Sequence, residues 1–367
     1  MENAHSIRSA NIQLEQLFKH KYERGMFDGN VLVAHQGEVS FSGCYGWESY
    51  EKKTPLTLNS RFELASVTKP LTALGIKLLV QRSMLKENDA LANWLPDFPY
   101  PGVTVRHALT HTCGLPNYMA VIEDYWDHAR IAANRDALRL LAEHKPPQYF
   151  APGNSFRYSN TAYMCLASVI EEVSGLSYAD FMRKNVFEPA GMMDSMVINR
   201  RLQPELTTEN YAFGYIRLAD GRLCLPDELP ELQYVRYLDG IQGDGTVHST
   251  AVDLLRLDQA IRSGIFSDLQ DGKRLTNRDE WRDSEDTATG SLSGHVIDGW
   301  FAERRPVYGR MLGHSGGWPG YATRMCSYVD SGYTIILLCN VEPLDYRSRA
   351  EQPEDWQLQI EQLLMQL

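Results

Sequence analysis

The spacing of apolar and polar residues changes twice along the chain, and each change marks a new kind of secondary structure. Residues 7–26 carry apolar side chains at the spacing of one helix face, which predicts an amphipathic helix. Two short runs rich in β-branched and aromatic residues follow, at 30–35 and 38–43. Only Gln36 and Gly37 separate these runs, and this arrangement predicts a β-hairpin.

The pattern becomes helical in the middle of the chain and returns to strands near the end. Between about residues 80 and 266, apolar residues at helical spacing are interrupted by long loops that contain Pro and Gly. Three β-rich runs follow at 307–314, 321–329 and 333–340, and the segment 356–367 predicts a closing helix. The order is therefore a helix and hairpin, a long helical segment, three strands and a helix.

This order predicts an α+β fold with an antiparallel sheet of five strands or more, flanked by the N- and C-terminal helices. Short strands with local connections pair in antiparallel fashion, so the two N-terminal strands must join the three C-terminal ones across the helical segment. We therefore expect a discontinuous α/β domain of residues 1–80 and 287–367 and an inserted, mostly α-helical (all-α) domain of residues 81–286. A cleft between two such domains is where the active site is expected.

Composition narrows the class of protein. A chain of 367 residues with 43% hydrophobic and 23% charged residues is typical of a globular protein, and no apolar run reaches the about 18 residues that a membrane span needs. A net charge of −11 without any cluster of Lys and Arg argues against nucleic acid as a partner. Residues 1–8 lack the features of a secretory signal, so we expect a cytoplasmic protein.

The six cysteines are scattered along the chain, and none forms a Cys-x-x-Cys pair. This spacing indicates neither a zinc site nor a disulfide framework. We therefore expect no metal and no cofactor.

Ser66 and Lys69 are the first candidates for chemistry. They precede the apolar segment 71–80, and residues three apart share one face of a helix. A serine hydroxyl becomes a good nucleophile when a nearby base takes its proton, and a desolvated lysine can serve as that base. Ser-x-x-Lys also occurs often by chance, and the alternative is a capped helix with an ordinary solvated lysine.

A second stretch places two polar residues beside an apolar element. Tyr158 and Asn160 lie between a turn-rich loop and an apolar helix at 162–173. A tyrosine there can approach Ser66 and Lys69, and the ammonium group would favour its phenolate form and let it carry protons. The amide of Asn160 offers a donor and an acceptor to a substrate amide, and the alternative is that it caps the helix.

A third stretch is the glycine-rich segment 313–320, at the end of a predicted strand. Glycines allow the backbone to approach a ligand closely, so the amides of this segment and of Ser66 can form an oxyanion hole. His314 is placed to orient a carboxylate or the pair Tyr158 and Lys69. The alternative is a turn between strands with His314 on the surface.

The order of these motifs resembles the signature of serine β-lactamases and penicillin-binding proteins. The motifs are Ser-x-x-Lys from Ser66, Tyr-Ser-Asn from Tyr158 and His-Ser-Gly from His314. The tyrosine in the second motif resembles one branch of the family. That branch holds class C β-lactamases, D-alanyl-D-alanine carboxypeptidases, D-aminopeptidases and β-lactamase-like esterases.

Three further segments extend the resemblance over most of the chain, from about residue 31 to 340. Residues 105–116 are similar to the family segment R-H-L-L-T-H-T-S-G-L, with Cys113 in place of its Ser. Residues 187–192 resemble its F-x-P-L-G-M turn, and residues 243–254 its G-G-x-x-S-T-A-x-D-L segment. The family fold agrees with the sheet and helical insert predicted from the pattern.

The resemblance implies a role for each of the main candidates. Ser66 would be the nucleophile that is acylated, with Lys69 and Tyr158 as its proton-transfer pair. The amide of Asn160 would hydrogen-bond the acyl-side amide of the substrate. The backbone amides of Ser66 and Gly317 would form the oxyanion hole.

The third motif departs from the commonest family pattern, because His314 stands where a lysine is usual. A lysine supplies a permanent cation for a carboxylate, whereas a histidine is mostly neutral at pH 7, so strong β-lactamase activity is not expected. Arg324 would supply the missing cation if it points into the cleft, and otherwise it is a strand residue facing solvent. The remaining candidates for contact with substrate are Ser315, Gly316, Trp318, Tyr321, Tyr118 and Trp126. For the four aromatic residues the alternative is packing, which is the more frequent role of aromatic side chains in such loops.

The resemblance therefore implies a serine hydrolase that forms an acyl-enzyme at Ser66 with a small-molecule amide or ester. D-amino-acid peptides and carboxylic esters are expected before β-lactams. One alternative is an acyltransferase or peptide cyclase that passes the acyl group to an amine or alcohol. The other is a non-catalytic penicillin-recognising or scaffold protein.

Overall fold

The computed structural model describes residues 2–266, 282–283, 296–344 and 352–365. Its centre is an eight-stranded sheet, in which all neighbouring pairs except one are antiparallel. The exception is the pair of β10 and β12, which is parallel. In spatial order the strands are β10 (Arg282–Asp283), β12 (Trp300–Arg305), β13 (Gly309–Trp318), β14 (Tyr321–Tyr328), β15 (Tyr333–Cys339), β1 (Gly29–His35) and β2 (Glu38–Tyr45), and β11 (Val296–Ile297) pairs with β12.

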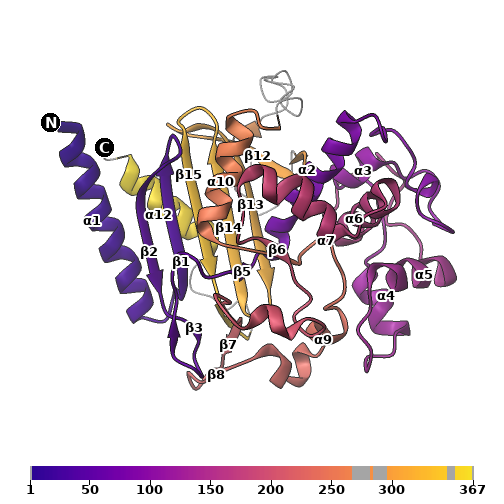
Figure 1. The fold of residues 1–367 in the computed structure, drawn as a ribbon, viewed down its shortest axis with the longest axis horizontal. Helices are drawn as coiled ribbons and strands as arrows, with labels where there is room; N and C mark the ends of the chain where they lie inside the picture. The colour runs from indigo at the N-terminus through magenta and orange to yellow at the C-terminus, as the bar shows by residue number, and fades with distance from the viewer. Residues whose placement is uncertain (1, 267–281, 284–295, 345–351, 366–367) are drawn as a thin grey trace.

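β1 joins the two ends of the chain in this sheet (Figure 1). It pairs with β2 through the predicted hairpin and with β15 on its other edge, where Val31 lies opposite Leu337. Gln36 and Gly37 have φ values of 52° and 85°, as a tight turn between twisted strands requires. The predicted α+β fold with an antiparallel sheet of at least five strands is confirmed.

Helices cover both faces of the sheet. The helices are α1 (Glu2–Glu23), α2 (Thr68–Gln81), α3 (Val105–Leu109), α4 (Tyr118–Tyr125), α5 (Asn134–His144), α6 (Asn160–Ser174), α7 (Tyr178–Met182), α8 (Glu188–Ala190), α9 (Tyr234–Tyr237), α10 (Ala251–Arg262) and α12 (Pro353–Leu364). A π-helical turn, Arg183–Phe187, lies between α7 and α8. In Figure 1, α1 and α12 flank the sheet on one side, and α3 to α7 gather on the other.

Alternate residues of each central strand belong to two separate cores. On β1, Val31 and Val33 pack in a core with Trp356 of α12, whereas Leu32 and Ala34 pack in a core with the apolar residues of α2. Strands that are buried on both faces need apolar side chains on both. This explains why the predicted strands read as continuous apolar runs rather than as alternating ones.

The segment predicted as all-helical also contains short strands. They are β6 (Met196–Val197), β7 (Tyr215–Arg217), β8 (Leu223–Cys224) and β9 (Val247–Ser249), which pair with one another or with β5 (Phe62–Glu63) and β16 (Val341–Pro343). Strands of two or three residues are too short to show a period in the sequence. A further two-stranded sheet consists of β3 (Trp47–Ser49) and β4 (Thr54–Pro55). The division into two domains stays a prediction, and α10 packs against β15 and β1 although it lies within residues 81–286.

The glycine-rich segment is part of a strand rather than a turn after one. β13 continues to Trp318, which pairs with Tyr321 across a turn at Pro319 and Gly320. β12 pairs with β13 only as far as Gly313. Within the described residues, the outer edge of the last five residues of β13 has no strand partner, so their backbone groups are available to a ligand.

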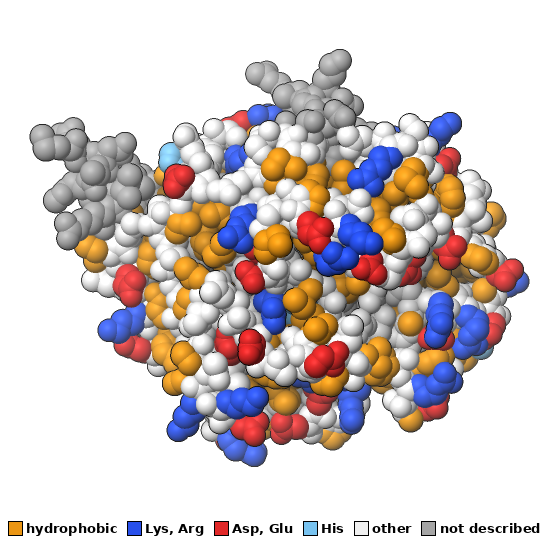
Figure 2. Space-filling model, in the orientation of Figure 1, with side chains coloured by type: hydrophobic (Ala, Val, Ile, Leu, Met, Phe, Trp, Pro, Cys, Tyr) orange, Lys and Arg blue, Asp and Glu red, His pale blue; other side chains and the backbone are white. Residues whose placement is uncertain are grey.

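Among the described residues, no helix is both long and apolar enough to cross a bilayer. The face drawn in Figure 2 mixes acidic and basic side chains, with apolar ones between them.

Candidate active site

Ser66 lies on a short 3-10 turn between β5 and α2, and this turn is held from two sides. The backbone amide of Leu64 donates to the carbonyl oxygen of Val247 (2.8 Å), and its carbonyl accepts from the hydroxyl of Thr323 (2.6 Å). Ala65 has a φ of 47°, a left-handed conformation that costs a residue with a Cβ about 1 kcal/mol or more. The surrounding contacts keep this strained turn in place and present Ser66 at the start of α2.

Lys69 follows Ser66 by one helical turn and is fully buried. Its Nζ donates hydrogen bonds to Oγ of Ser66 (3.0 Å) and to the backbone carbonyl oxygen of Asp244 (2.7 Å). Burial lowers the pKa of Lys69 to about 8, although the charge of Asp244 opposes this shift. A lysine with such a pKa is partly neutral near pH 7, so it is able to accept the proton of Ser66.

Tyr158 lies beside both residues. Its ring centroid is 4.9 Å from Nζ of Lys69, and its hydroxyl hydrogen-bonds with Ser66. Burial raises the pKa of Tyr158 by more than this hydrogen bond lowers it. Burial thus opposes the phenolate form that the neighbouring ammonium group would favour. The protonated phenol is a group that can donate a proton.

His111 packs against the ring of Tyr158. It is fully buried with a φ of 56°, and its ring centroid lies 4.5 Å from that of Tyr158. Its Nδ1 accepts a hydrogen bond from the backbone N–H of Ser159 (3.1 Å). Burial and the charge of Lys69 hold the pKa of His111 well below its usual value, so the ring is neutral. His111 thereby fixes the position of the Tyr-Ser-Asn loop.

His314 is also a buried, neutral histidine. Only 2% of its surface is exposed, and its Nδ1 lies 2.7 Å from the carbonyl oxygen of Ser315. A carbonyl oxygen can only accept, so Nδ1 carries the proton and Nε2 carries a lone pair. Burial, followed by the charge of Lys69, lowers the pKa of His314 to about 3. His314 therefore provides no cation for a carboxylate.

Two glycines of β13 pass close to the nucleophile. A Cβ on Gly316 would lie 2.3 Å from the carbonyl oxygen of Leu64, 2.3 Å from the hydroxyl of Thr323 and 3.0 Å from the amide nitrogen of Ser66. Only glycine permits this approach of the strand to the start of α2. Gly317 follows with open space beside it and lines the pockets described next.

Two pockets adjoin the nucleophile and share Ser66, Gly317 and Trp318. The smaller one, of about 60 Å³, is named here the Asp244 pocket. The larger one, of about 580 Å³, is named the His314 pocket. The second volume is in the range that holds small-molecule ligands.

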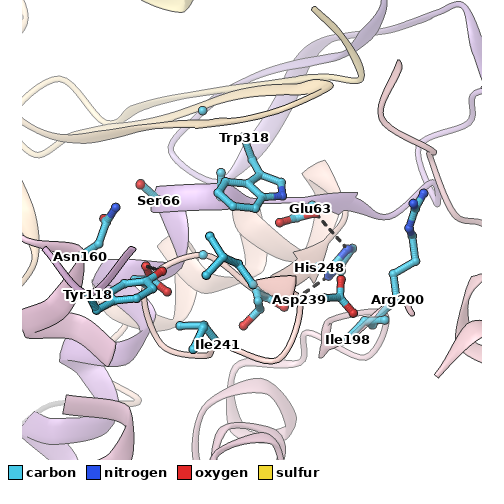
Figure 3. Close-up of a pocket in the computed structure, with 16 residues that line it drawn as sticks. Glu63, Ser66, Tyr118, Asn160, Ile198, Arg200, Asp239, Ile241, His248 and Trp318 are labelled. Atoms are coloured by element: carbon cyan, nitrogen blue, oxygen red, sulfur yellow. Dashed lines mark hydrogen bonds and ion pairs between the residues drawn. The ribbon is translucent and has the colours of Figure 1, made fainter. Parts of the chain in front are cut away.

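The Asp244 pocket is rich in ionisable groups (Figure 3). The carboxylate of Asp244 is buried and accepts a hydrogen bond from the hydroxyl of Tyr118 (2.8 Å). Burial raises the pKa of Glu63 to about 8, with the charge of Asp239 as a further cause. Nε2 of His248 lies 3.9 Å from Glu63, and burial lowers the pKa of that histidine to about 3, so the ring is neutral.

Six of the predicted substrate contacts line these pockets. Asn160 and Tyr118 line the Asp244 pocket, His314, Ser315 and Gly316 line the His314 pocket, and Trp318 lines both. Figure 3 shows Asn160 and Tyr118 on the same side of the Asp244 pocket as Ser66.

Arg324 fits neither alternative given for it, because it lines neither pocket and is buried rather than exposed to solvent. Its guanidinium group hydrogen-bonds with Gln357 and pairs with Glu354 at 2.9 Å, both on α12. Successive side chains of a strand point to opposite faces, and the neighbour Thr323 is the one that faces the Ser66 turn. Arg324 thus stabilises the packing of α12 on the sheet.

Tyr321 and Trp126 likewise lie outside the two pockets that adjoin Ser66. The hydroxyl of Tyr321 donates to the carbonyl oxygen of Ala212 (2.8 Å), and its ring is buried. The indole N–H of Trp126 donates to the carbonyl oxygen of Arg130 (2.8 Å). Neither residue lines the two pockets, so both are corrected to packing residues.

Sequence reasoning did not single out His111 or Asp244 as site residues. Both lie in segments that resemble the family, 105–116 and 243–254, and that position was the only signal. The residues around them in the sequence do not indicate that their side chains lie near Ser66, because long loops bring these segments to the site. Among the described residues, no three His, Cys, Asp or Glu side chains are grouped as a metal site.

Comparison with known proteins agrees with this geometry. A family model described as Beta-lactamase matches residues 14–356. Penicillin-binding protein 4* of Bacillus subtilis (strain 168) is 44% identical over 336 residues, which are 90% of this chain and 71% of that protein. Esterase EstB of Burkholderia gladioli is 30% identical over 270 residues, which are 66% of this chain and 67% of the esterase.

Solved structures share the fold. A penicillin binding protein from Bacillus halodurans has a TM-score of 0.72 at 25% identity, covering 94% of this chain and 98% of its own. A D-amino acid amidase from Ochrobactrum anthropi SV3, complexed with L-phenylalanine amide, has a TM-score of 0.73 at 22% identity, covering 100% and 99%. The amidase shows likeness of fold alone. Since the family model spans nearly the whole chain, the protein belongs to the Beta-lactamase family.

Proposed function

We propose that this protein is a serine hydrolase that forms an acyl-enzyme at Ser66 and releases the acyl group to water. The observation that carries the proposal is the buried amine of Lys69, 3.0 Å from Oγ of Ser66, with its pKa lowered to about 8. A serine with such a base within hydrogen-bond distance meets the requirement for an activated nucleophile. A relative named as an esterase supports hydrolysis as the outcome.

Acylation would use four groups of the site. Oγ of Ser66 attacks the substrate carbonyl carbon while its proton passes to the neutral amine of Lys69. The carbonyl oxygen becomes an oxyanion that accepts hydrogen bonds from the backbone amides of Ser66 and Gly317. The bond to the leaving group then breaks, and the leaving group takes the proton of Tyr158, which is replaced from the ammonium group of Lys69. The result is an ester on Ser66, with Lys69 neutral again.

Deacylation would run through the same groups in reverse. A water molecule attacks the ester carbon and loses a proton toward Lys69, and the oxyanion forms again. The bond to Oγ of Ser66 breaks, and Ser66 regains a proton. The acyl group leaves as a carboxylic acid.

The proposed substrates are small amides or esters, with D-amino-acid derivatives and carboxylic esters ahead of β-lactams. The acyl side of the substrate would lie near Asn160, whose amide can bond an acyl-side amide group. The neighbouring carboxylate of Asp244 favours acyl groups that carry a hydrogen-bond donor or a positive charge. A β-lactam brings a carboxylate, for which neither His314 nor Arg324 supplies a cation.

Acyl transfer is the second candidate function, and the size of the His314 pocket favours it. A space of about 580 Å³ that opens at Ser66 leaves room for an amine or alcohol in place of water. Adding an amine to the assay would then divert the acyl group from the acid to an amide, which mass spectrometry of the products detects.

The test compares the wild type with Ser66→Ala on p-nitrophenyl acetate, D-alanine p-nitroanilide and nitrocefin. We expect turnover of the ester or the anilide in the wild type and its loss in Ser66→Ala. Ser263→Ala is the matched control, because its hydroxyl donates to the carbonyl oxygen of Ala260 at the end of α10 and the residue lines neither pocket. Equal turnover in Ser66→Ala, or no turnover of any of these compounds by the wild type, contradicts the proposal.

A further inference from the structure

The ring of Tyr158 belongs to a cluster of aromatic rings that includes Phe301 of β12. The centroids of these two rings are 6.3 Å apart, and their planes differ by only 19°. The ring of Phe301 also lies 5.2 Å from that of His314, and only 8% of the phenylalanine is exposed. These separations are within the range in which aromatic rings attract one another. Phe301 is therefore a second support for Tyr158, in addition to His111.

Tyr158 needs such support because its backbone belongs to no helix or strand. It lies in the loop before α6, one residue ahead of Ser159, the N-cap of that helix. A proton donor works only within hydrogen-bond reach of the reacting group, and displacement by a fraction of an ångström weakens it. The contacts of the ring therefore decide whether the hydroxyl of Tyr158 stays at Ser66.

The strand that carries Phe301 is fixed against the helix that carries Lys69. β11 and β12 form a hairpin whose two turn residues, Asp298 and Gly299, have φ values of 47° and 84°. A Cβ on Gly299 would lie 3.0 Å from Cα of Pro70 and 3.1 Å from the carbonyl oxygen of Lys69. The carboxylate of Asp298 pairs with Nζ of Lys77, also on α2, at 3.1 Å. The hairpin is thus docked on α2 two residues before Phe301.

We propose that Phe301 is a positioning residue for proton donation by Tyr158. Its ring holds Tyr158 at Ser66, and the docked hairpin keeps that ring at a fixed place relative to Lys69. This inference rests on the proposed function, and it adds a residue that acts on the leaving group through Tyr158. Removal of the Phe301 ring should therefore harm a substrate more when its leaving group depends more on a proton.

The test uses two esters with the same acyl group, p-nitrophenyl acetate and phenyl acetate. Phenolate is a stronger base than p-nitrophenolate, so its departure depends more on a proton from the protein. In Phe301→Leu we expect kcat/KM to fall by no more than about threefold for p-nitrophenyl acetate and by at least about tenfold for phenyl acetate. Tyr158→Phe, which removes the proton donor itself, should show the same order with a larger loss.

A double-mutant cycle shows whether Phe301 acts through Tyr158. In the Tyr158→Phe background, Phe301→Leu should cause no further loss with phenyl acetate, because the two changes remove the same effect. A general structural defect, or a lost contact between Phe301 and the substrate, would persist in that background.

Phe98→Leu is the matched control for the loss of a buried ring. Phe98 is also 8% exposed, and its ring lies 5.4 Å from that of Tyr100. It lines neither pocket, so this variant should lose no selectivity between the two esters. Thermal melting checks the fold of every variant. Phe301→Met, which keeps a flexible apolar side chain in place of the ring, replaces Phe301→Leu in the test if the leucine variant does not fold.

The outcomes separate this inference from the proposed function. Equal losses on both esters in Phe301→Leu, while Tyr158→Phe is selective, overturn the inference and leave the hydrolase intact. A loss from Phe301→Leu that persists in full in the Tyr158→Phe background also overturns it. Equal losses on both esters in Tyr158→Phe refute the proton donor of the proposed function, and the inference falls with it.

Discussion

Lys69 sets the pH dependence of the proposed reaction, because only its neutral form can take the proton of Ser66. Burial lowers its pKa from 10.5 to about 8. This shift means that burial disfavours the charged form of Lys69, relative to the neutral form, by about 3 kcal/mol. At pH 7 about 9% of Lys69 is then neutral, against about 0.03% for an ordinary lysine, so burial supplies roughly 300-fold more base. Below pH 7 we expect kcat/KM to rise about tenfold per pH unit, and to level off above about pH 9.

Substitution of Asp244 should shift the rising part of the pH profile, called its limb below, in a defined direction. The charge of Asp244 raises the pKa of Lys69, so Asp244→Asn should shift the limb of the profile to lower pH. Lys69→Arg keeps a positive charge but cannot act as a base, since a guanidinium stays protonated at every accessible pH. We expect Lys69→Arg to lose activity by at least about a hundredfold and to show no limb.

The assay is the initial rate with p-nitrophenyl acetate between pH 5.5 and 9.5, corrected for the uncatalysed reaction. This ester has no ionisable group, so the profile reports the protein alone. Circular dichroism at each pH checks that the fold is intact. A flat profile over this range, a limb unchanged in Asp244→Asn, or an active Lys69→Arg would refute the role of Lys69 as base.

Three predictions concern stability and packing. Burial lowers the pKa of His248 and of His314 to about 3. Between pH 3 and 6.5 the unfolded chain therefore binds more protons than the folded one, so the free energy of unfolding falls as the pH drops below 6.5. At pH 5 each histidine should lower the free energy of unfolding by about 2 kcal/mol, which urea unfolding measures. Gly316→Ala should lower the melting temperature and abolish turnover, because its methyl group would lie 2.3 Å from a backbone oxygen. Gly317→Ala is the control. It should melt near the wild-type temperature, because there is open space beside Gly317. Arg324→Leu should destabilise the protein by about 2 kcal/mol in the same unfolding assay, since the guanidinium group stabilises the packing of α12 on the sheet.

Periodicity sufficed for five strands of the sheet and for the pairing of its distant ends, but it did not reveal β12. The hairpin at Gln36 and the three late strands all carry apolar side chains that must be buried, and one shared sheet buries them. The pairing of β1 with β15 agrees with this expectation. Periodicity did not reveal the extent of β13, because glycines have low strand propensity. Pairing with β14 overrides that propensity as far as Trp318. Strands of two or three residues, such as β6, left no pattern to read.

The site was predictable where spacing along one element fixes geometry. Ser66 and Lys69 meet because they are one helical turn apart, and the hydrogen bond between them follows from that spacing. The direction of Arg324 was not predictable, because β14 is buried on both faces and its apolar pattern does not distinguish them. The contact of Asp244 with Lys69 depends on loop paths across 175 residues, which no local pattern encodes.

The central claim is that Ser66 carries the acyl group during turnover, and intact-protein mass spectrometry tests it most directly. The wild type is mixed with p-nitrophenyl acetate, quenched in acid within the first turnovers and compared with Ser66→Ala. The account predicts a mass increase of one acetyl group in the wild type, located by peptide mapping on the peptide that contains Ser66, and none in Ser66→Ala. An acetyl group on another residue with Ser66 unmodified, or the same adduct yield in Ser66→Ala, would contradict it.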